Sequence, residues 1–260
     1  KEAAGALYQV GLLYERVDDV KQQRRIWKLF IDRHNETVGM ESLIIEALGK
    51  LSDIALAKRD KRGHKKLRER ILVEYKARDM QPKTPAAYVA AKAQFQIIEE
   101  TFATYNKLRV KSSDLKKAGE TINKKKAMLS DLQTQYQNLA DYQSFEWVVA
   151  AVYRIADLYA EFAQMIYKVP EPKGLDDEEL DMYVTQIEDM GLQFEEIAIQ
   201  KYEKAVEESR RLKVTNEWSK RALVAINKFK PDDYPLFKQE KFKTIFSPTY
   251  TLDNRAPQAR

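Results

Sequence analysis

The sequence contains no cysteine, and this absence removes two kinds of stabilising chemistry. Disulfide bonds cannot form, and metal sites that depend on thiolate ligands are excluded. A chain without thiols is compatible with the cytosol and with an oxidising envelope compartment. It favours the oxidising envelope compartment, where an unpaired thiol would be prone to unwanted oxidation.

Glycine and proline are also scarce, with 8 of each in 260 residues, whereas 33% of the residues are charged. The turns of a sheet would consume more glycine and proline, so this composition predicts long helices. No apolar run approaches the roughly 18 residues that a membrane span needs, and no secretory signal is visible. The chain opens on Lys1 without an initiator methionine, and we therefore expect a mature form or a piece of a longer protein.

Patterns typical of catalysis are missing as well. The two histidines, His34 and His64, have no histidine partner three or four residues away, so neither forms a metal-binding pair. We expect His34 to cap a helix end, and the acidic run at residues 176–179 to begin a helix, where negative charge complements the helix dipole. No phosphate-cradling glycine loop or nucleophile elbow is present. The sequence thus predicts no enzyme, no cofactor, no metal site and no small-molecule substrate.

Helical periodicity runs along nearly the whole chain. It predicts helices over residues 2–16, 19–34, 40–58, 61–79, 86–109, 113–142, 145–169, 176–212 and 216–229. Thr84 is expected to cap the helix that has Pro85 at its first position, and Asn216 to cap the last helix. The predicted fold class is all-α.

The first two predicted helices carry apolar and small residues at spacings typical of a helical hairpin. The set comprises Leu7, Val10, Gly11 and Tyr14 on the first helix, and Trp27 and Phe30 on the second. Because Gly11 has no side chain, it lets the partner helix approach closely. Over residues 4–37 the pattern resembles a tetratricopeptide (TPR) unit of 34 residues, a hairpin that must stack on neighbours to bury its apolar face.

The next two predicted helices, over residues 40–79, fit this unit only loosely. Gly49 takes the place that Gly11 holds in the first hairpin. Lys65 and Arg68 fall where large apolar residues would sit. The resemblance implies an α-solenoid of TPR-like hairpins at the start of the chain.

Two later segments change to a seven-residue spacing. The first repeats apolar positions at Leu115, Ile122, Leu129 and Tyr136, with Ala118, Lys125, Leu132 and Leu139 three residues after each. The second repeats them at Phe145, Val152, Tyr159 and Ile166, with Val148, Ile155, Phe162 and Val169 three residues after each. Two such seams in succession predict a long antiparallel helical hairpin as the stable centre of the molecule.

Proline-rich connectors divide the chain. Pro82 and Pro85 interrupt the helical pattern once, and residues 170–174 interrupt it again. The predicted parts are TPR-like hairpins over 1–80, a long antiparallel helical region over 85–168, a C-terminal helical region over 175–246 and an extended tail over 247–260.

Positive charge is concentrated in one segment. Residues 58–70 carry eight cations, Lys58, Arg59, Lys61, Arg62, Lys65, Lys66, Arg68 and Arg70, and two anions, for a net charge of +6 against +5 for the whole chain. The segment is either a solvated helix face and turn or an electrostatic dock for an acidic protein, an anionic lipid or nucleic acid. Nucleic acid is the weaker candidate, because no aromatic residues interleave with the charges.

A second candidate surface lies on the first helix. In a TPR unit the first helix lines a concave groove that holds peptides. Tyr8 and Gln9 lie off the predicted core stripe and are therefore groove candidates. The alternative is that this face packs on a preceding repeat.

A more specific resemblance comes from the second half of the chain. It rests on Phe145-Glu146-Trp147, Tyr153-Arg154-Ile155, Pro170-Glu171-Pro172, Lys201-Tyr202-Glu203-Lys204-Ala205, Asn216-Glu217-Trp218 and residues 231–235. In this order they resemble the C-terminal part of large TPR proteins of deltaproteobacterial cell envelopes, in particular the TPR lipoproteins of the adventurous gliding-motility machinery.

This resemblance implies a protein-binding scaffold in the periplasm or at the outer membrane, with other proteins of an envelope complex as partners in motility or transport. The lipidated cysteine of a lipoprotein is absent, so membrane association would depend on partners or on an anchor outside this sequence. The alternative is a cytosolic TPR adaptor that binds peptide or nucleic acid through residues 58–70.

Overall fold

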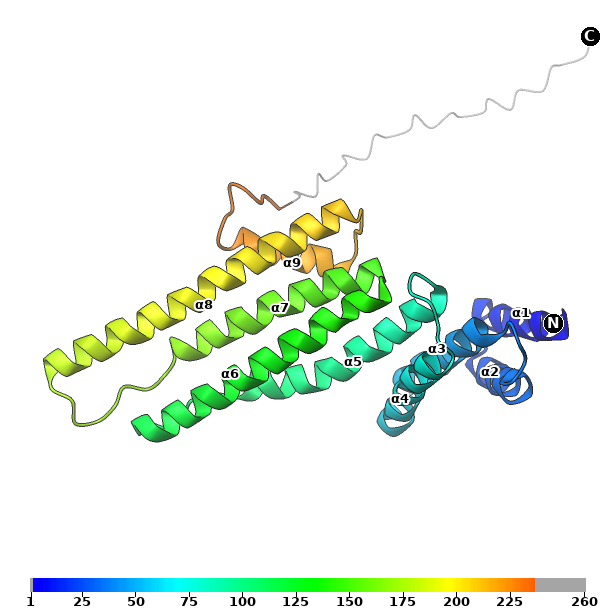
Figure 1. Cartoon of the computed structure of the whole chain (residues 1–260), viewed down its shortest axis with the longest axis horizontal. Helices are drawn as coiled ribbons and strands as arrows, with labels where there is room; N and C mark the ends of the chain where they lie inside the picture. The colour runs from blue at the N-terminus through cyan, green and yellow to red at the C-terminus, as the bar shows by residue number, and fades with distance from the viewer. Residues whose placement is uncertain (1, 237–260) are drawn as a thin grey trace, which may run out of the picture.

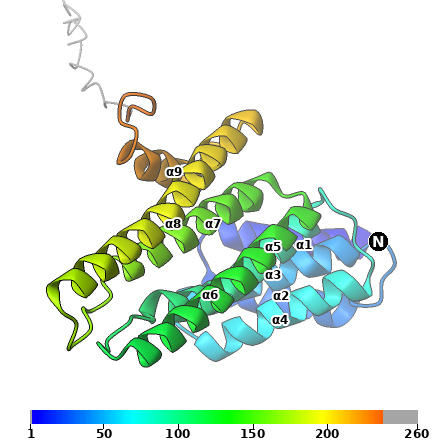
Figure 2. The ribbon, with the colours of Figure 1, turned by 60° about the vertical axis from the view of Figure 1, so that its left-hand side comes forward.

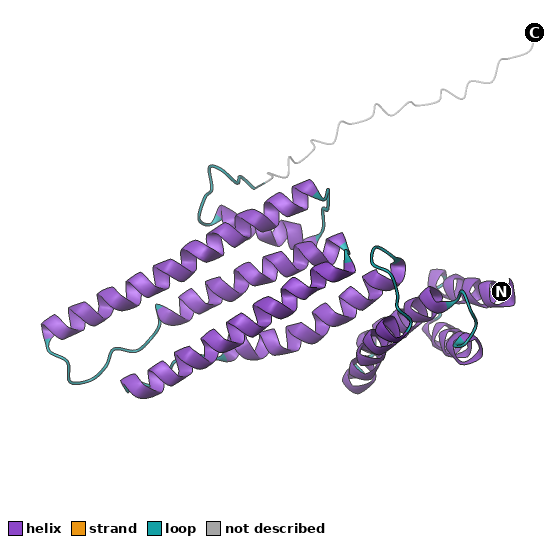
Figure 3. Cartoon of the chain, viewed as in Figure 1, coloured by secondary structure: helices purple, strands orange, loops and turns teal. Residues whose placement is uncertain are grey.

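The computed structural model describes residues 2–236, and helices are the only regular elements within that range (Figure 1, Figure 3). In chain order they are α1 (Glu2–Arg16), α2 (Val20–His34), α3 (Glu41–Ala57), α4 (Lys61–Ala77), α5 (Pro85–Lys107), α6 (Leu115–Gln137), the 3₁₀ helix η1 (Asn138–Tyr142), α7 (Phe145–Ile166), α8 (Asp177–Arg211) and α9 (Glu217–Asn227). The predicted all-α class is confirmed. The tail predicted over residues 247–260 lies outside the described residues.

Polar side chains at the predicted caps begin several of these helices. Thr84 accepts a hydrogen bond from a backbone N–H in the first turn of α5, which opens with Pro85. Asn216 forms a capping box at the start of α9, and Asp176 forms another with Glu179 at the start of α8. These caps satisfy backbone N–H groups that have no partner inside the helix, and so they determine where each helix begins.

Helices α1–α4 form two hairpins around one apolar core. Trp27 is completely buried at its centre, and its ring lies 5.1 Å from that of Tyr8, centroid to centroid. A Cβ atom on Gly11 would lie 2.4 Å from a carbon of the Trp27 ring, so only glycine permits this packing. This is the close approach that the sequence predicts for Gly11.

The buried stripe of α1 differs from the predicted one. Its buried residues are Ala4, Tyr8 and Gly11, whereas the predicted core positions Leu7, Val10 and Tyr14 are only partly buried. The helix is rotated relative to the expectation because the Tyr8 ring fills the space beside the Trp27 and Phe30 rings. Trp27 and Phe30 themselves are fully buried, as expected.

The two hairpins share one turn geometry. Asp18 and Arg59 adopt φ angles of 54° and 57°, and the next residue in each case, Asp19 or Asp60, caps the following helix. These two caps are 41 positions apart, which is longer than the 34-residue unit that the sequence resembles. The extra length comes from the connector over residues 35–40 and from α3, which has 17 residues against 15 in α1.

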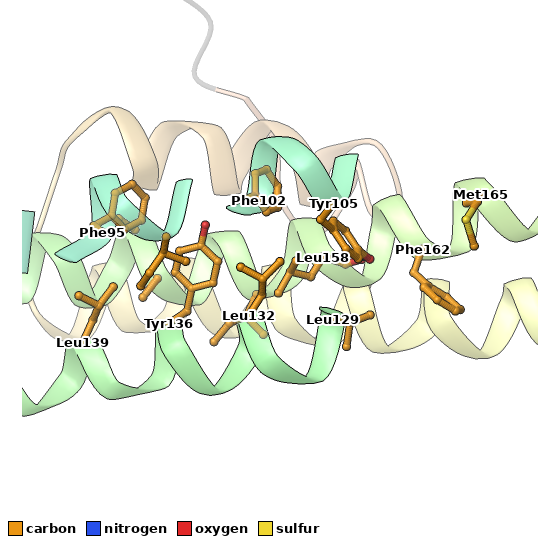
Figure 4. Close-up of a cluster of buried hydrophobic side chains, with 14 of the residues drawn as sticks. Phe95, Phe102, Tyr105, Leu129, Leu132, Tyr136, Leu139, Leu158, Phe162 and Met165 are labelled. Carbon is orange, nitrogen blue, oxygen red and sulfur yellow. The ribbon is translucent and has the colours of Figure 1, made fainter. Parts of the chain in front are cut away.

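The remaining helices form a bundle, whose centre appears in Figure 4. Side chains of α5, α6, η1 and α7 pack together there, namely Phe95, Phe102, Tyr105, Leu129, Leu132, Tyr136, Leu139, Leu158, Phe162 and Met165. The buried hydroxyl of Tyr105 donates a hydrogen bond of 2.5 Å to the Leu158 carbonyl. Each large side chain buried in this way contributes roughly 1.5–3 kcal/mol to folding.

Helices α6 and α7 run antiparallel and pack together (Figure 1), as the seven-residue spacing predicts. The seams are shorter than predicted, because Leu115 and Phe145 are 57% and 48% exposed. The most extensive packing within the described chain joins α7 to α8 and not to α6, since α8 is 35 residues long and α7 is buried on several faces. The predicted hairpin is thus one part of a larger bundle.

One cation is buried in this bundle and a second, Arg154, is half-buried. Lys125, the polar break in the predicted seam, is fully buried, and its Nζ lies 3.3 Å from the carbonyl oxygens of Leu108 and Glu161. Burial lowers the pKa of Lys125 to about 8. Arg154 donates two hydrogen bonds to Glu99, at 2.9 and 2.7 Å, so its charge is paired across α7 and α5.

Helix α5 belongs to both regions. Ala86, Ala90 and Ala93 pack into the core of α1–α4, whereas Phe95 and the apolar residues after it pack into the bundle. From a second viewpoint α1–α4 lie together, partly behind α5 and α6 (Figure 2). The boundary predicted between residues 80 and 85 falls where the chain enters this shared helix.

Candidate functional site

The basic segment, residues 58–70, forms the turn between α3 and α4 and the first part of α4. Six of its cations are exposed and form no side-chain ion pair within residues 2–236: Lys58, Arg59, Lys61, Arg62, Lys65 and Lys66. Arg70 is exposed and pairs with Glu74 at 3.3 Å within the same helix. A surface whose charges are not neutralised by neighbours keeps its positive field available to a partner.

The eighth cation of this segment, Arg68, is buried. When the two hairpins are aligned on their capping residues Asp19 and Asp60, Arg68 takes the position of Trp27. Their exposed fractions are 4% and 0%. The prediction that Arg68 occupies an apolar position is therefore confirmed, whereas Lys65 is exposed and does not.

The buried guanidinium of Arg68 is only partly compensated by ion pairs and hydrogen bonds. Its guanidinium pairs with Glu100 of α5, whose side chain is 54% exposed, and its Nε has no hydrogen-bond partner within residues 2–236. A buried charge is costly unless its hydrogen-bonding capacity is met in full. An arginine at a core position with an unmet donor is thus a feature that stability alone does not favour.

A cavity of about 390 Å³ opens beside Arg68. It is lined by Leu56, Arg59, Asp60, Lys61, His64, Lys65, Arg68 and Glu100. Four of these side chains are cationic and two are anionic, so a carboxylate that enters the cavity meets a net positive field. The exposed Leu56 adds an apolar surface at the same place.

His64 joins α3 to α4 behind this cavity. Its Nδ1 lies 2.9 Å from the Ser52 hydroxyl and 3.0 Å from the Ser52 carbonyl oxygen. Burial lowers the pKa of His64 below its ordinary value, and the nearby Arg68 charge acts in the same direction. His64 is therefore neutral at pH 7 and corresponds to Gln23 of the first hairpin, which is also buried.

The face formed by α1, α3 and α5 is polar but self-paired. Lys50 forms an ion pair with Glu15 at 2.6 Å, and Lys92 forms one with Asp53 at 2.7 Å. These pairs bridge α1 to α3 and α3 to α5. Since its charges are neutralised in place, this face attracts a charged partner less strongly than the basic segment does.

The two groove candidates on α1 have different surroundings. Tyr8 is 8% exposed, and its hydroxyl donates a hydrogen bond of 3.0 Å to Glu46. It is a core residue and does not line an open groove, because its ring packs against Trp27. Gln9 is exposed, and its contact with a partner stays a prediction.

Sequence-based reasoning missed two charged segments. Residues 107–126 carry 8 Lys or Arg and 2 Asp or Glu, a second basic segment of +6. Residues 174–200 carry 9 Asp or Glu and no Lys or Arg, although only the first four of these anions were noticed. Counting both signs of charge in windows along the whole chain is the signal that finds them.

Within residues 2–236, no group of three or more histidine, aspartate or glutamate side chains is placed to hold a metal ion. Nor does any helix in that range combine the length and the apolar character that crossing a membrane requires. No model of a known protein family matches the sequence, and no curated protein sequence matches it. Function is therefore inferred from the charge and geometry of the chain itself.

Proposed function

We propose that this chain is a non-enzymatic scaffold of TPR-like hairpins whose basic segment binds acidic surfaces of partner proteins. One observation carries this proposal: three of the six unpaired surface cations, Arg59, Lys61 and Lys65, line a cavity that is also lined by the buried Arg68. An arginine in place of a core aromatic residue does not improve packing. It does supply a fixed positive charge where a carboxylate of a partner can bind.

The packing order of the helices supports the scaffold assignment. Helix α2 packs on α3, α4 packs on α5, and α3 also contacts α5. The second hairpin therefore meets α5 through both of its helices, and the first meets α3 mainly through α2, which is compatible with stacked α-solenoid repeats. Such stacks present long surfaces and bind partners over broad areas, which fits a surface patch better than an enclosed catalytic pocket.

The cellular setting that we propose is a bacterial cell envelope, in the periplasm or at the outer membrane, within a motility or transport assembly. This part of the proposal rests on the resemblance carried by residues 145–235 and on the lack of cysteine. A cytosolic adaptor that binds peptide or nucleic acid is the competing assignment.

Chemical crosslinking in the native cells, followed by mass spectrometry of the captured partners, tests the proposal. We expect envelope proteins with acidic surfaces, captured less efficiently as salt increases, because exposed charges are screened over about 8 Å at physiological ionic strength. Specific capture of cytosolic proteins or nucleic acid would overturn the envelope assignment. Capture that is indifferent to salt would overturn the electrostatic dock.

A further inference from the structure

The first part of α8 forms a projecting acidic arm, residues 177–189. It contains six Asp or Glu residues and no Lys or Arg. None of its residues is buried, and Met182 is 58% exposed. In Figure 1 this arm extends beyond the end of α7, at the left end of the long axis of the molecule.

The arm is only partly packed against the rest of its own chain. Helix α8 comes into close contact with the end of α7 at Gly191, where a Cβ atom would lie 2.2 Å from the Tyr167 ring. Before that point Ile187 packs against the core of the bundle, and the Tyr183 hydroxyl donates a long hydrogen bond of 3.4 Å to the Pro170 carbonyl. A helical segment of this length is marginal by itself in water. Asp177 and Asp181, one turn apart, also repel each other.

The basic segment is complementary to the arm in charge and also has an exposed apolar group beside it. Its six unpaired cations match the six anions of the arm in number and are opposite in sign. Exposed apolar groups lie within both surfaces, Met182 on the arm and Leu56 at the edge of the cavity. Docking would relieve the repulsion within the arm and bring its carboxylates to the cations around Arg68.

We propose that the acidic arm of one copy docks on the basic segment of a second copy, so that the chain associates head to tail. This inference rests on the proposed function of the basic segment as a dock for acidic proteins. In one copy the arm and α4 lie far apart along the long axis (Figure 1), so the pairing occurs between copies. An interface between two different patches generates chains or rings of molecules.

Sedimentation velocity of the purified 260-residue chain over a range of concentrations tests this inference. At low salt, about 0.05 M, the average mass is expected to rise with concentration above the 30.3 kDa of one chain. At about 0.5 M salt it is expected to return to the mass of one chain, because screening shortens the reach of the charges. A single chain at every concentration in low salt would overturn the inference.

Charge-swapped variants identify the two surfaces. The segment variant carries Lys61→Glu, Arg62→Glu, Lys65→Glu and Lys66→Glu, and the arm variant carries Glu178→Lys, Asp181→Lys, Glu188→Lys and Asp189→Lys. Each variant by itself is expected to be a monomer, because like charges then face each other. A mixture of the two is expected to associate, since each reversed surface meets a complementary one. A mixture that stays dissociated would contradict the pairing.

A matched control separates this pairing from a change in net charge. Lys116→Glu, Lys117→Glu, Lys124→Glu and Lys126→Glu reverse four exposed cations of α6 and alter the net charge by the same amount as the segment variant. We expect this control to associate as the wild type does. Equal loss of self-association in the control and the segment variant would overturn the inference.

A wild-type chain that never self-associates, yet still captures other acidic proteins through its basic segment, would overturn the inference and leave the proposed function intact.

Discussion

The first and second hairpins use the same turn but bury different side chains behind it. In the first, Trp27 packs against Gly11 and completes an apolar core. In the second, Arg68 occupies the position of Trp27, and a cavity rimmed by cations opens beside it. The same local structure thus serves stability in one hairpin and presents charge in the other. Substitutions that convert one hairpin toward the other test this division.

The largest effect is expected from Trp27→Ala. Removal of a completely buried indole leaves a cavity and loses its contacts with Tyr8, so the free energy of unfolding should fall by about 3–5 kcal/mol. Urea denaturation followed by circular dichroism measures this. Val38→Ala, at a position 76% exposed, is the control and should change stability by less than about 0.5 kcal/mol. A loss below about 1 kcal/mol for Trp27→Ala would show that the first hairpin does not depend on this core.

The next largest change in stability is expected from replacing Gly11 of α1, and Gly5 of the same helix is expected to respond with the opposite sign. Gly11→Ala should destabilise the chain by about 1–3 kcal/mol, because the new methyl group meets the buried Trp27 ring. Gly5→Ala meets no atom within 4 Å and should stabilise the chain by about 0.5–1 kcal/mol through helix propensity. Thermal unfolding of both variants gives the sign of each change. The same sign in both would contradict the close approach of α1 and α2.

Arg68→Leu should separate stability from binding in the second hairpin. Replacing a buried, incompletely paired cation by an apolar residue is expected to leave stability unchanged or raise it by up to about 2 kcal/mol, since the half-exposed Glu100 stays hydrated. Affinity for an acidic partner captured by crosslinking should fall about tenfold, which is the loss of one charge-assisted contact of roughly 1.4 kcal/mol.

The outcome that contradicts this interpretation of Arg68 is a loss of stability of more than about 3 kcal/mol, because that is typical of breaking a structural buried ion pair. Arg70→Leu is the matched control. Within the described part of the chain, exposed Arg70 pairs only with Glu74 of its own helix, so its replacement should have little effect on stability.

His64 gives the second hairpin a weak dependence on pH that Gln23 does not give the first. The folded-state pKa of His64 is lowered, so the unfolded chain takes up a proton first as the pH falls below about 6.5, and stability decreases. Between pH 7 and 5 the wild type should lose more stability than the His64→Gln variant, because the unfolded chain then takes up a proton that the buried imidazole takes up less readily. Urea denaturation at both pH values measures the difference. A smaller loss in the wild type would contradict the burial of a neutral imidazole.

The smallest effect on stability is expected from reversing the exposed cations. Lys61→Glu with Lys65→Glu should change the free energy of unfolding by less than about 0.5 kcal/mol, because neither side chain forms an ion pair within residues 2–236. A destabilisation above about 1 kcal/mol, measured by thermal denaturation, would show that these cations support the fold.

The sequence was sufficient for much of the fold. The apolar periodicity, Thr84 with Pro85 and Asn216 located the helices, because caps and amphipathic spacing are local properties of the chain. Sequence could not show which face of α1 is buried, since that depends on the Tyr8 and Trp27 rings meeting across two helices. Nor could it show that α8 and not α6 is the main partner of α7, because that choice depends on long-range packing.

For the candidate site, the cluster of cations was visible in the sequence and the role of Arg68 only in part. Its spacing indicated a core position, but the pairing with Glu100 joins residues that are 32 positions apart. The acidic arm was missed because only the run at residues 176–179 was considered, and it was interpreted as a helix start. That interpretation accounts for Asp176 and Glu179, which form the capping box, and it does not account for Glu188 and Asp189 further along.

The most direct test of the central claim compares partner capture by two charge-reversed variants in the native cells. One carries the reversals at Lys61, Arg62, Lys65 and Lys66, and the other carries those at Lys116, Lys117, Lys124 and Lys126 of α6. Quantitative mass spectrometry after crosslinking should show at least a tenfold loss of the specific partners in the first variant and little loss in the second. Equal capture by both variants would contradict the assignment of the basic segment as the docking site.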